Sequence, residues 1–485
     1  MRVRHEADFN DPGFLTPPET SLLVDQYELA MAASYHRQGM NEPAAFELFA
    51  RRLPPNRDWL LAAGLGPALR LVTELRFGAR ELEYLASIGF PREFLDYLGD
   101  FRFSGDIDAV PEGSLVFTNE PLVRVTASRI EGQLLETLLL NQVNFQTMLA
   151  TKAARIVLAA GGGDPGRGGE VVDFSPRRDH GADAAMKAAR SAAIAGAAGT
   201  SNVAAAMRYG LPPVGTMAHS YVMSFASEED AFRTFMRDTP ENAVMLVDTY
   251  ETLEGVRRAI SASRATGVRL RGVRLDSGDI PSLARETRRL LDEAGMGETT
   301  IVASGDLDEG QIARCVAAGA PVDVWGVGTD LGTSRDSPTV NGVYKLVADR
   351  GVDGRWRGVV KRSAAKATMP GRKQVFRRYE ADGTMSADTI ALAGEDCRGE
   401  RLLVPAMRGG EIVGPESLAE VRGRAARELR SLPRELRVPG EGERRAYPVE
   451  WSEHLREAAA EATALAGVEA PAGAAGGPGS RSTSD

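Results

Sequence analysis

The spacing of hydrophobic and polar positions changes twice along the chain. Residues 21–37 have helical periodicity, with Ser21 as a possible N-cap. In residues 108–128, apolar and polar positions alternate, which predicts two antiparallel strands joined near Asn119. Residues 130–160 are apolar on much of a helical circumference, which predicts a buried helix. Strand–helix units of about 25–30 residues follow, as in parallel sheets with crossover helices.

These changes set the domain boundaries that we expect. Residues 1–140 should form an N-terminal α+β domain, and residues 141–345 an α/β domain. Alternation returns after Tyr344, so residues 346–468 are expected to add antiparallel strands and to pack with the N-terminal domain. Residues 469–485 have the composition of a disordered tail.

Short apolar runs in the central domain are predicted to be strands. They are VVDF, PPVGTMA, AVMLVD, RGVRL, TIVAS and VDVWGV, and a short GTSN stretch supplies one further, irregular unit. An open doubly wound sheet and a closed barrel both accommodate such units. Polar residues directly follow the strands, and only a barrel brings all of those loops to one mouth. We therefore predict an irregular, TIM-like α/β barrel with its active site at the strands' carboxyl ends.

Composition narrows the class of protein. The net charge of -9 argues against a nucleic-acid-binding surface, so an anionic substrate needs a local positive site. Cys315 and Cys397 lack metal-ligand spacing, and we expect reduced thiols. The start of the chain lacks the apolar core of a signal peptide, and no apolar run is long enough to span a bilayer. We expect a cytoplasmic protein that does not bind membranes.

The run GVRLDSGD places Arg274 and Asp276 at the end of a predicted strand. A guanidinium and a carboxylate facing inward there need each other or a ligand to offset their desolvation. Ser277 and Asp279 lie in the tight turn that follows. For Asp279, a helix N-cap with Pro281 in the first turn is an equally good interpretation.

Two earlier loops carry groups suited to binding an anion. Arg177 and Arg178 follow VVDF and are suited to a bidentate grip on a carboxylate or phosphate, although a surface pair is the alternative. Phe174 beside them either stacks on a planar ring or belongs to the core. Residues 200–202, Thr-Ser-Asn, form either a helix N-cap or an anion site at a helix N-terminus.

His219 follows the predicted strand PPVGTMA. A lone histidine is usually structural, but at the mouth of a barrel its imidazole is suited to act as a base, a phosphate donor or a nucleophile toward phosphorus. The other histidines are scattered, so no zinc site is expected. Four aspartates near the mouth are suited to water-mediated Mg²⁺ or to ribose hydroxyls: Asp248, Asp276, Asp279 and Asp306.

Several stretches resemble one family in order, from about Leu22 to about Arg378. They are PLVRVTASRIEGQLLETLLLNQVNFQTMLATKAARI, DFSPRRDHGADAAMKAAR, GTSNVAAAMRYGLPPVGTMAHSYVMSF, GVRLDSGDI, WGVGTDLGTS, NGVYKLV and PGRKQVF. Together they resemble nicotinate phosphoribosyltransferase. The resemblance implies a type II phosphoribosyltransferase barrel, with an α+β domain formed by the N-terminal and C-terminal segments.

The resemblance also implies an activity in NAD biosynthesis, on the Preiss–Handler salvage route. Enzymes of this family transfer phosphoribosyl from phosphoribosyl pyrophosphate (PRPP) to nicotinate, giving nicotinate mononucleotide and diphosphate. They couple this transfer to hydrolysis of ATP to ADP and phosphate. Mg²⁺ is expected with PRPP and ATP, and no metal site made by the protein alone is predicted.

The resemblance assigns roles to individual residues. His219 matches the histidine that ATP phosphorylates, and Arg274 with Asp276 match the pair at the ribose and pyrophosphate. Phe174 and Arg177 match positions at the pyridine ring. From their places in the loops we also predict substrate contacts by Thr200, Ser201, Asp248, Ser277 and Asp279.

Other residues are assigned to phosphates or to a shared site. Tyr27 matches a tyrosine that reaches the ring from the partner subunit, which implies a homodimer. The loops after two late strands, and basic residues of the last domain, match phosphate-holding positions: Gly305, Asp306, Gly328, Thr329, Lys361, Arg372 and Lys373. Glycine-rich loops of this kind offer backbone N–H groups to phosphate.

Departures from the family pattern leave questions. Ser175-Pro176 replaces a glycine and a larger residue, which affects loop geometry, and Asp330 stands where a basic residue is common. A nicotinamide-using relative, which has Asp at the Ser201 position, and a non-catalytic nucleotide sensor are the alternatives. Ser201 with Arg177 suits a carboxylate better than an amide, and the intact set of charged groups argues against a sensor. The glycine-rich run 161–170 lies outside the resemblance.

Overall fold

The computed structural model describes residues 15–161, 169–351, 353–361, 368–437 and 446–465. The chain forms two compact units, the first from residues 1–148, 339–433 and 444–485 and the second from residues 149–338 and 434–443. The tail expected at 469–485, and most of the run 161–170, lie outside the described residues. Each unit is described on its own below.

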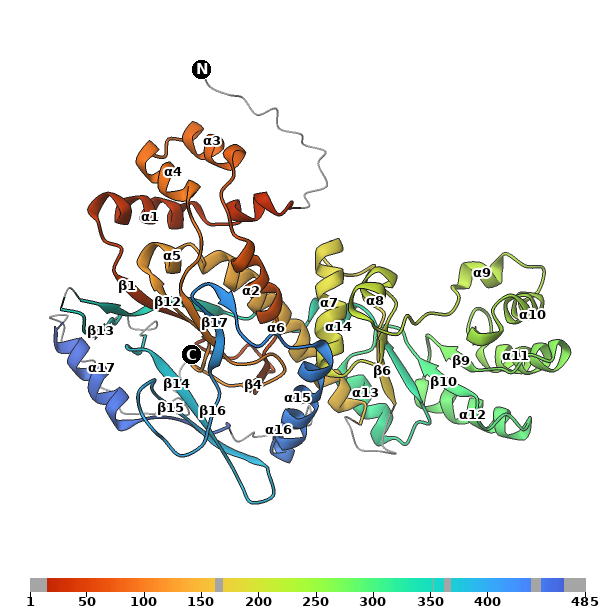
Figure 1. Ribbon diagram of the computed structural model, residues 1–485. Coiled ribbons are helices and arrows are strands. Elements are labelled where there is room, and N and C mark those ends of the chain that lie inside the picture. Colours follow the sequence, from red (N-terminus) through yellow and green to blue (C-terminus); the bar gives the residue numbers. More distant parts are fainter. Residues whose placement is uncertain (1–14, 162–168, 352, 362–367, 438–445, 466–485) are drawn as a thin grey trace, which may run out of the picture. The chain divides into compact units, whose positions relative to one another are not determined.

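The first unit is built on an antiparallel seven-stranded sheet in the order β13-β12-β1-β5-β3-β17-β18. Segments from both ends of the chain meet in it, because β1 pairs on one side with β12 and on the other with β5 (Figure 1). The strands are β1 (Pro43–Ala50), β3 (Asp106–Ala109), β5 (Pro121–Ser128), β12 (Gly342–Arg350), β13 (Trp356–Gly358), β17 (Val404–Arg408) and β18 (Glu411–Ile412).

Two smaller sheets complete the strands of this unit. A four-stranded sheet has the order β16-β14-β15-β19, and β2 pairs with β4. Their bounds are β2 (Leu60–Leu61), β4 (Leu115–Val116), β14 (Lys373–Tyr379), β15 (Met385–Leu392), β16 (Glu400–Arg401) and β19 (Val449–Trp451). The antiparallel pairing predicted within residues 108–128 is confirmed at the start of the run, where Asp108 and Ala109 of β3 pair with β5. Nearer the predicted turn it is not, because β4 pairs with β2.

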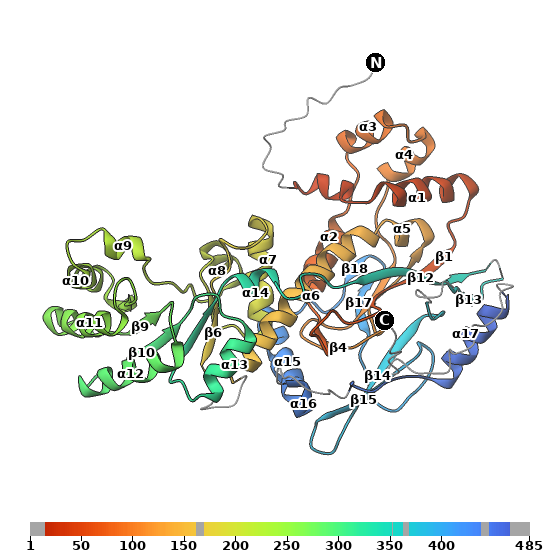
Figure 2. The same cartoon turned by 180° about the vertical axis from the view of Figure 1, so that it is seen from behind.

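Helices flank these sheets. Helices α1, α3 and α4 lie together in both views of the molecule (Figures 1 and 2). The helices whose bounds begin in this unit are η1 (Pro18–Leu22), α1 (Gln26–Gln38), α2 (Leu65–Glu74), α3 (Ala79–Ser87), α4 (Arg92–Gly99), α5 (Arg129–Gln133), α6 (Glu136–Ala159), α15 (Leu418–Ser431) and α17 (Glu453–Leu465). The predicted Ser21 cap is wrong, since Ser21 lies in η1 and Asp25 is the N-cap residue of α1.

The second unit contains a six-stranded parallel sheet in the order β7-β6-β11-β10-β9-β8. Its strands are β6 (Glu170–Asp173), β7 (Gly199–Thr200), β8 (Val244–Leu246), β9 (Gly272–Leu275), β10 (Thr300–Ala303) and β11 (Val324–Val327). This is the strand order of an α/β barrel, but among the described residues β7 and β8 do not pair. The sheet is thus a curled, TIM-like half-barrel, in keeping with the irregular barrel predicted.

Helices connect these parallel strands. The helices that begin in this unit are α7 (Ala182–Ala195), α8 (Val203–Tyr209), α9 (His219–Met223), α10 (Glu228–Asp238), η2 (Pro240–Asn242), α11 (Thr252–Thr266), α12 (Ile280–Glu293), α13 (Glu309–Ala317), α14 (Thr329–Thr333) and α16 (Arg434–Arg437). Helix α12 packs against β9 and β10 (Figure 1).

The predicted strand PPVGTMA is wrong. Only an isolated bridge between Thr200 and Pro213 occurs there. Pro212 and Pro213 cannot donate backbone hydrogen bonds to a neighbouring strand, which accounts for the failure of a ladder to form. His219 consequently begins a short helix at the end of an irregular segment rather than following a strand.

Candidate active site

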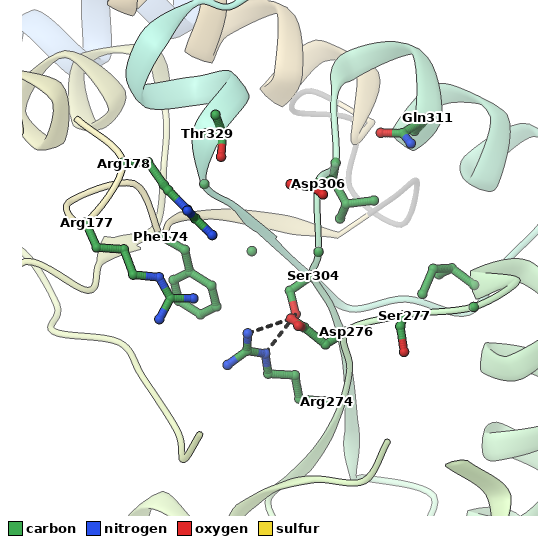
Figure 3. Close-up of a pocket in the computed structure, with 16 residues that line it drawn as sticks. Phe174, Arg177, Arg178, Arg274, Asp276, Ser277, Ser304, Asp306, Gln311 and Thr329 are labelled. Atoms are coloured by element: carbon green, nitrogen blue, oxygen red, sulfur yellow. Dashed lines mark hydrogen bonds and ion pairs between the residues drawn. The ribbon is translucent and has the colours of Figure 1, made fainter. Parts of the chain in front are cut away.

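A pocket of about 390 Å³ opens at the carboxyl ends of four neighbouring strands of the second unit (Figure 3). Phe174, Arg177 and Arg178 reach it from the loop after β6. The ends of β9, β10 and β11 supply the remaining walls, with Arg274, Asp276, Ser304, Asp306 and Thr329 among the lining residues. This is the edge at which parallel α/β sheets place their active sites.

Arg274 faces the pocket because of the alternation in β9. Val273 and Leu275 are fully buried, whereas the Arg274 side chain is 14% exposed. Its guanidinium carbon lies 5.2 Å from the centroid of the Phe174 ring, a cation–π contact. The same guanidinium donates from Nη2 to Oδ1 of Asp276 at 2.6 Å. The predicted Arg–Asp pair is therefore formed, and Phe174 lies against it.

Ser304 joins this pair from the end of β10. Its hydroxyl accepts a hydrogen bond from Arg274 Nε at 2.7 Å and donates one to Asp276 Oδ1 at 2.5 Å (Figure 3). Burial disfavours ionisation of Asp276, but the Ser304 and Arg274 contacts outweigh burial and hold the pKa of this carboxyl below its ordinary value. Asp276 is an ionised carboxylate at neutral pH.

Gly305 explains how the loops after β9 and β10 come so close. Its φ is +88°, and a Cβ atom at this position would lie 1.9 Å from the backbone oxygen of Asp276. Only glycine fits both the left-handed conformation and this approach of two backbones. The Gly305–Asp306 turn therefore fixes the distance between Ser304 and Asp276.

His219 lies beside the same carboxylate. Its Nε2 is 4.0 Å from Asp276 Oδ2 and 4.0 Å from Asp248 Oδ1, and its Nδ1 lies 3.1 Å from the Thr249 hydroxyl. If Nδ1 carries the proton and donates to Thr249, the Nε2 lone pair is free to act as a nucleophile. The side chain is 41% exposed, so this lone pair is accessible.

Asp248 supports the turn after β9. Its Oδ2 accepts from the Asp276 backbone N–H at 3.1 Å and from the Ser277 hydroxyl at 2.7 Å. Its Oδ1 is buried and has no hydrogen-bond partner among the described residues, although it faces His219. Asp279 is the N-cap residue of α12, yet its side chain makes no capping hydrogen bond. The carboxylate of Asp279 is exposed and does not line the pocket.

Two models of known protein families match this chain. Residues 22–144 match the nicotinate phosphoribosyltransferase (NAPRTase) N-terminal domain, and residues 170–385 match the nicotinate phosphoribosyltransferase (NAPRTase) family. Together the matched ranges cover more than half of the chain. This chain belongs to the nicotinate phosphoribosyltransferase family.

Individual relatives agree with the family match. The chain is 45% identical over 440 residues to nicotinate phosphoribosyltransferase pncB2 of Mycobacterium tuberculosis, covering 90% of this chain and 92% of that one. It is 43% identical to nicotinate phosphoribosyltransferase of Bacillus subtilis, covering 79% of this chain and 78% of that protein. The crystal structure of human nicotinic acid phosphoribosyltransferase matches with a TM-score of 0.77 and 28% identity, covering 90% of this chain and 99% of that one.

The departure at Ser175-Pro176 is absorbed by hydrogen bonds in the loop after β6. The Ser175 backbone N–H donates to Asp173 Oδ1 at 2.8 Å, and its hydroxyl donates to Asp179 Oδ2 at 3.1 Å. The loop thus keeps Arg177 and Arg178 at the pocket. Neither Arg177 nor Arg178 forms an ion pair with another described residue, so both guanidiniums are available to an anion in the pocket.

The surroundings of two carboxyl groups in and next to this loop shift their pKa values. Burial raises the pKa of Asp173 despite its hydrogen bonds from Ser175 and Thr200. Burial, together with repulsion from Asp173, raises the pKa of Asp179 to about 7. The loop that carries the two arginines therefore rests on a carboxyl that titrates near neutral pH.

The Thr200 side chain supports the loop after β6, and the substrate contact predicted for this residue stays a prediction. Its side-chain hydroxyl donates to Asp173 Oδ2 at 2.7 Å, and the residue is 1% exposed. Asn202 accepts from Ala205 N and caps α8, so the capping interpretation of residues 200–202 is the one that the structure favours. Ser201 is half-buried, and its backbone N–H donates to Asp173 O.

Asp330 does not face the pocket as an unpaired negative charge. Its carboxylate is 4% exposed and lies 3.3 Å from Lys152 Nζ and 2.7 Å from Arg335. Lys152 of α6 is itself buried and also pairs with Glu309 at 2.5 Å and Asp336 at 3.0 Å. This ion cluster ties α6 to the helices that follow the two glycine-rich loops. The departure at Asp330 is therefore part of the scaffold.

Four predicted residues lie in the first unit, whereas the pocket is lined by residues of the second unit. Tyr27 on α1 is 48% exposed, and burial together with nearby Glu136 and Glu28 raises its pKa. Lys361 is exposed, and Arg372 stacks on the Trp356 ring at 4.5 Å.

The phosphate-binding role predicted for Lys373 does not agree with its surroundings. Its ammonium is buried, pairs with Glu47 at 2.8 Å and donates to the carbonyls of Met369 and Gly371. Because an ammonium has three donors, no donor is left for a phosphate.

Two contributors to this site were not identified from the sequence. Ser304 ends a predicted strand next to Gly305, and its polar character at a strand end was the available signal. Lys152 lies in a helix that reads as apolar core, and no local pattern distinguishes it. Its role depends on carboxylates more than 150 positions later in the chain.

Proposed function

We propose that this protein transfers the phosphoribosyl group of PRPP to nicotinate, producing nicotinate mononucleotide and diphosphate for NAD salvage. We further propose that the transfer is coupled to hydrolysis of ATP to ADP and phosphate, through transient phosphorylation of His219. The observation that carries the proposal is the formed Arg274–Asp276 pair, in the pocket of a chain that belongs to the nicotinate phosphoribosyltransferase family.

The pocket suits two anionic ligands. Arg177 and Arg178 offer guanidinium groups for a carboxylate or phosphate, and guanidinium forks match either ligand bidentately. Phe174 presents a ring on the same side of the pocket (Figure 3). We assign nicotinate's carboxylate and ring to this side, and the phosphates of PRPP to the backbone of the Gly305 and Gly328 loops.

Ribosyl transfer requires charge stabilisation more than proton transfer. The ring nitrogen of nicotinate forms a bond to the anomeric carbon, while the bond from that carbon to the pyrophosphate oxygen breaks and its electron pair leaves with diphosphate. Arg274 is placed to stabilise the departing negative charge, and the Asp276 carboxylate is placed to orient ribose hydroxyls. Positioning of the two substrates accounts for most of the remaining rate enhancement.

Mg²⁺ is expected to enter with the phosphates, where it neutralises their charge. Among the described residues no group of three His, Cys, Asp or Glu side chains is arranged to hold a metal alone. We therefore propose that Mg²⁺ arrives bound to the substrate phosphates, and no side chain among the described residues is assigned as its direct ligand.

His219 offers a physical link between ATP and the PRPP site. In the proposed step, Nε2 bonds to the γ-phosphorus of ATP and ADP departs, and water later releases phosphate from the histidine. The phosphoryl group adds roughly two negative charges, by analogy with other phosphorylated side chains. Because Nε2 lies 4.0 Å from carboxylates of both Asp248 and Asp276, this charge repels groups that also position PRPP.

The proposed setting is a cytoplasmic homodimer. No helix within the described residues is long and apolar enough to cross a membrane. Tyr27 is exposed on α1, which suits a residue that contributes to the ring site of a partner subunit.

Steady-state kinetics with nicotinate and nicotinamide test the proposed substrate. We expect kcat/KM for nicotinate to exceed that for nicotinamide by at least about tenfold, because one charged hydrogen bond to an arginine contributes roughly 1.5–3 kcal/mol. Arg177→Ala should reduce this preference. A preference for nicotinamide would assign the protein to the amide-using class, and no turnover of either compound would favour a nucleotide sensor.

A further inference from the structure

Ser304 connects the two charged groups at the centre of the pocket. It is 2% exposed, at the end of β10, and its hydroxyl is both an acceptor for Arg274 Nε and a donor to Asp276 Oδ1. Arg274 Nη2 also donates to Asp276 Oδ1. One hydroxyl and one carboxylate oxygen thereby hold the edge of the guanidinium formed by Nε and Nη2.

We propose that Ser304 is a positioning residue for ribosyl transfer, an inference that rests on the proposed function. It orients Arg274 toward the leaving diphosphate and keeps Asp276 in the form that accepts hydrogen bonds from ribose. With Nε bonded to Ser304 and Nη2 to Asp276, the guanidinium presents its remaining N–H groups, including both on Nη1, to a ligand.

The backbone around Ser304 supports this role. Gly305 permits the close approach of the loops after β9 and β10, and Gly326 of β11 lies beside the Ser304 side chain, where an added Cβ would be 3.3 Å from Ser304 Cβ. The serine is thus held between neighbouring strands. Its hydroxyl direction is determined by the sheet and not by a mobile loop.

A neutral bridging hydroxyl has an effect that a direct ion pair lacks. It satisfies one lone pair of Asp276 and one donor of Arg274 without adding charge, so the pocket keeps its positive character toward an anion. The Ser304 hydrogen bond is also the largest of the interactions that lower the pKa of Asp276 against the opposing effect of burial. Loss of this hydroxyl should therefore raise the pKa of Asp276 and loosen Arg274.

Other charged groups near Asp276 also affect its pKa. Those in contact or within 4.0 Å are Arg274 and His219, and Asp248 accepts from its backbone. Arg177, Arg178 and Asp306 line the same pocket. Substitution of Ser304 removes none of these charges, so a raised pKa of Asp276 would report the lost hydroxyl together with the loosening of Arg274 that follows from it.

The test compares Ser304→Ala with Ser304→Thr, which keeps the hydroxyl, and with Ser191→Ala as a matched control. Ser191 of α7 is fully buried, and its hydroxyl has no hydrogen-bond partner among the described residues. For Ser304→Ala we expect kcat with nicotinate and PRPP to fall about 10- to 100-fold, as loss of hydrogen bonds to charged groups predicts. The acidic limb of the pH profile should move to higher pH. The KM for nicotinate should change little.

Wild-type kcat and an unmoved acidic limb in Ser304→Ala would overturn the inference. Equal losses in the alanine and threonine variants would also overturn it, because packing and not the hydroxyl would then be responsible. A carboxyl ¹³C NMR titration of Asp276, assigned with Asp276→Asn, makes the test independent of turnover. If the wild type proves inactive, the proposed function fails, whereas a raised Asp276 pKa in Ser304→Ala still supports the bridging role and an unchanged pKa removes it.

Discussion

Nε2 of His219 lies 4.0 Å from Oδ2 of Asp276, so the residue proposed to take a phosphoryl group borders the residue proposed to orient ribose. Nδ1 of the same ring contacts the Thr249 hydroxyl, which leaves Nε2 directed toward the carboxylates. Because the two groups are this close, we expect ATP hydrolysis and ribosyl transfer to be coupled electrostatically, and substitution of His219 tests that coupling.

Replacing His219 with Ala should separate the two activities. We expect loss of ATP hydrolysis and of an acid-labile phosphoprotein, while slow ATP-independent transfer persists because Arg274 and Asp276 remain paired. The measurement is ³²P transfer from γ-labelled ATP, run beside a product assay with and without ATP. Normal ATP hydrolysis by the variant, in step with product formation, would return His219 to a structural role.

Replacing Arg274 with Ala should depress both the ATP-dependent and the ATP-independent transfer. The lost stabilisation of the leaving diphosphate predicts a fall in kcat on the order of 10²–10³, the range found when a preorganised charge-stabilising group is removed. Arg271→Ala is a suitable control, because Arg271 pairs with the exposed Glu241 at 2.8 Å outside the pocket. Equal rates in the two variants would contradict the assigned role.

Asp179 should make the stability of the second unit depend on pH. Its pKa is raised to about 7 in the folded protein, above that of an unfolded aspartate, so the folded state binds more protons. Stability from this group is therefore present at pH 4 and is lost as pH rises toward about 7. Asp179→Asn should raise the thermal midpoint at pH 8 relative to wild type and have little effect at pH 4.

The control for that change is Asp183→Asn, an exposed aspartate that pairs with Lys187 of the same helix. It should leave the pH dependence of the thermal midpoint unaltered. A thermal midpoint for Asp179→Asn that follows wild type at every pH would contradict the raised pKa of Asp179.

Lys152 should be important for stability. Its ammonium is surrounded by carboxylates of Glu309, Asp330 and Asp336, so Lys152→Met removes the one cation that these three groups share. We expect a loss of about 3–5 kcal/mol in the free energy of unfolding, measured by denaturant titration. Lys187→Met, which breaks an i,i+4 pair with an exposed Asp183, should cost only about 0.3–0.5 kcal/mol. Similar losses in the two variants would contradict the importance given to the buried cluster.

The sequence predicted the structure correctly where the pattern lay within one short stretch of the chain. Alternation in the run ending at Leu275, followed by Asp-Ser-Gly-Asp, predicted both strand β9 and the placement of Arg274 and Asp276 at its end. The strand predicted at PPVGTMA was wrong. Its apolar residues favour a strand, but Pro212 and Pro213 lack the backbone N–H donors that a strand needs to pair.

Features that depend on distant partners could not be predicted. Ser304 meets Asp276 across 28 positions, and Lys373 meets Glu47 across 326, so neither partner is visible in a local pattern. The sequence therefore indicated which residues lie at the carboxyl ends of the strands. It did not indicate that Ser304 bridges Arg274 and Asp276, or that Lys373 forms an internal ion pair.

Diphosphate release from PRPP is the most direct test of the central claim. Purified protein with Mg²⁺ and PRPP should release diphosphate only when nicotinate is added, with one nicotinate mononucleotide formed for each diphosphate, and Arg274→Ala should lose most of this activity. Absence of nicotinate-dependent diphosphate release, with and without ATP, would contradict the account.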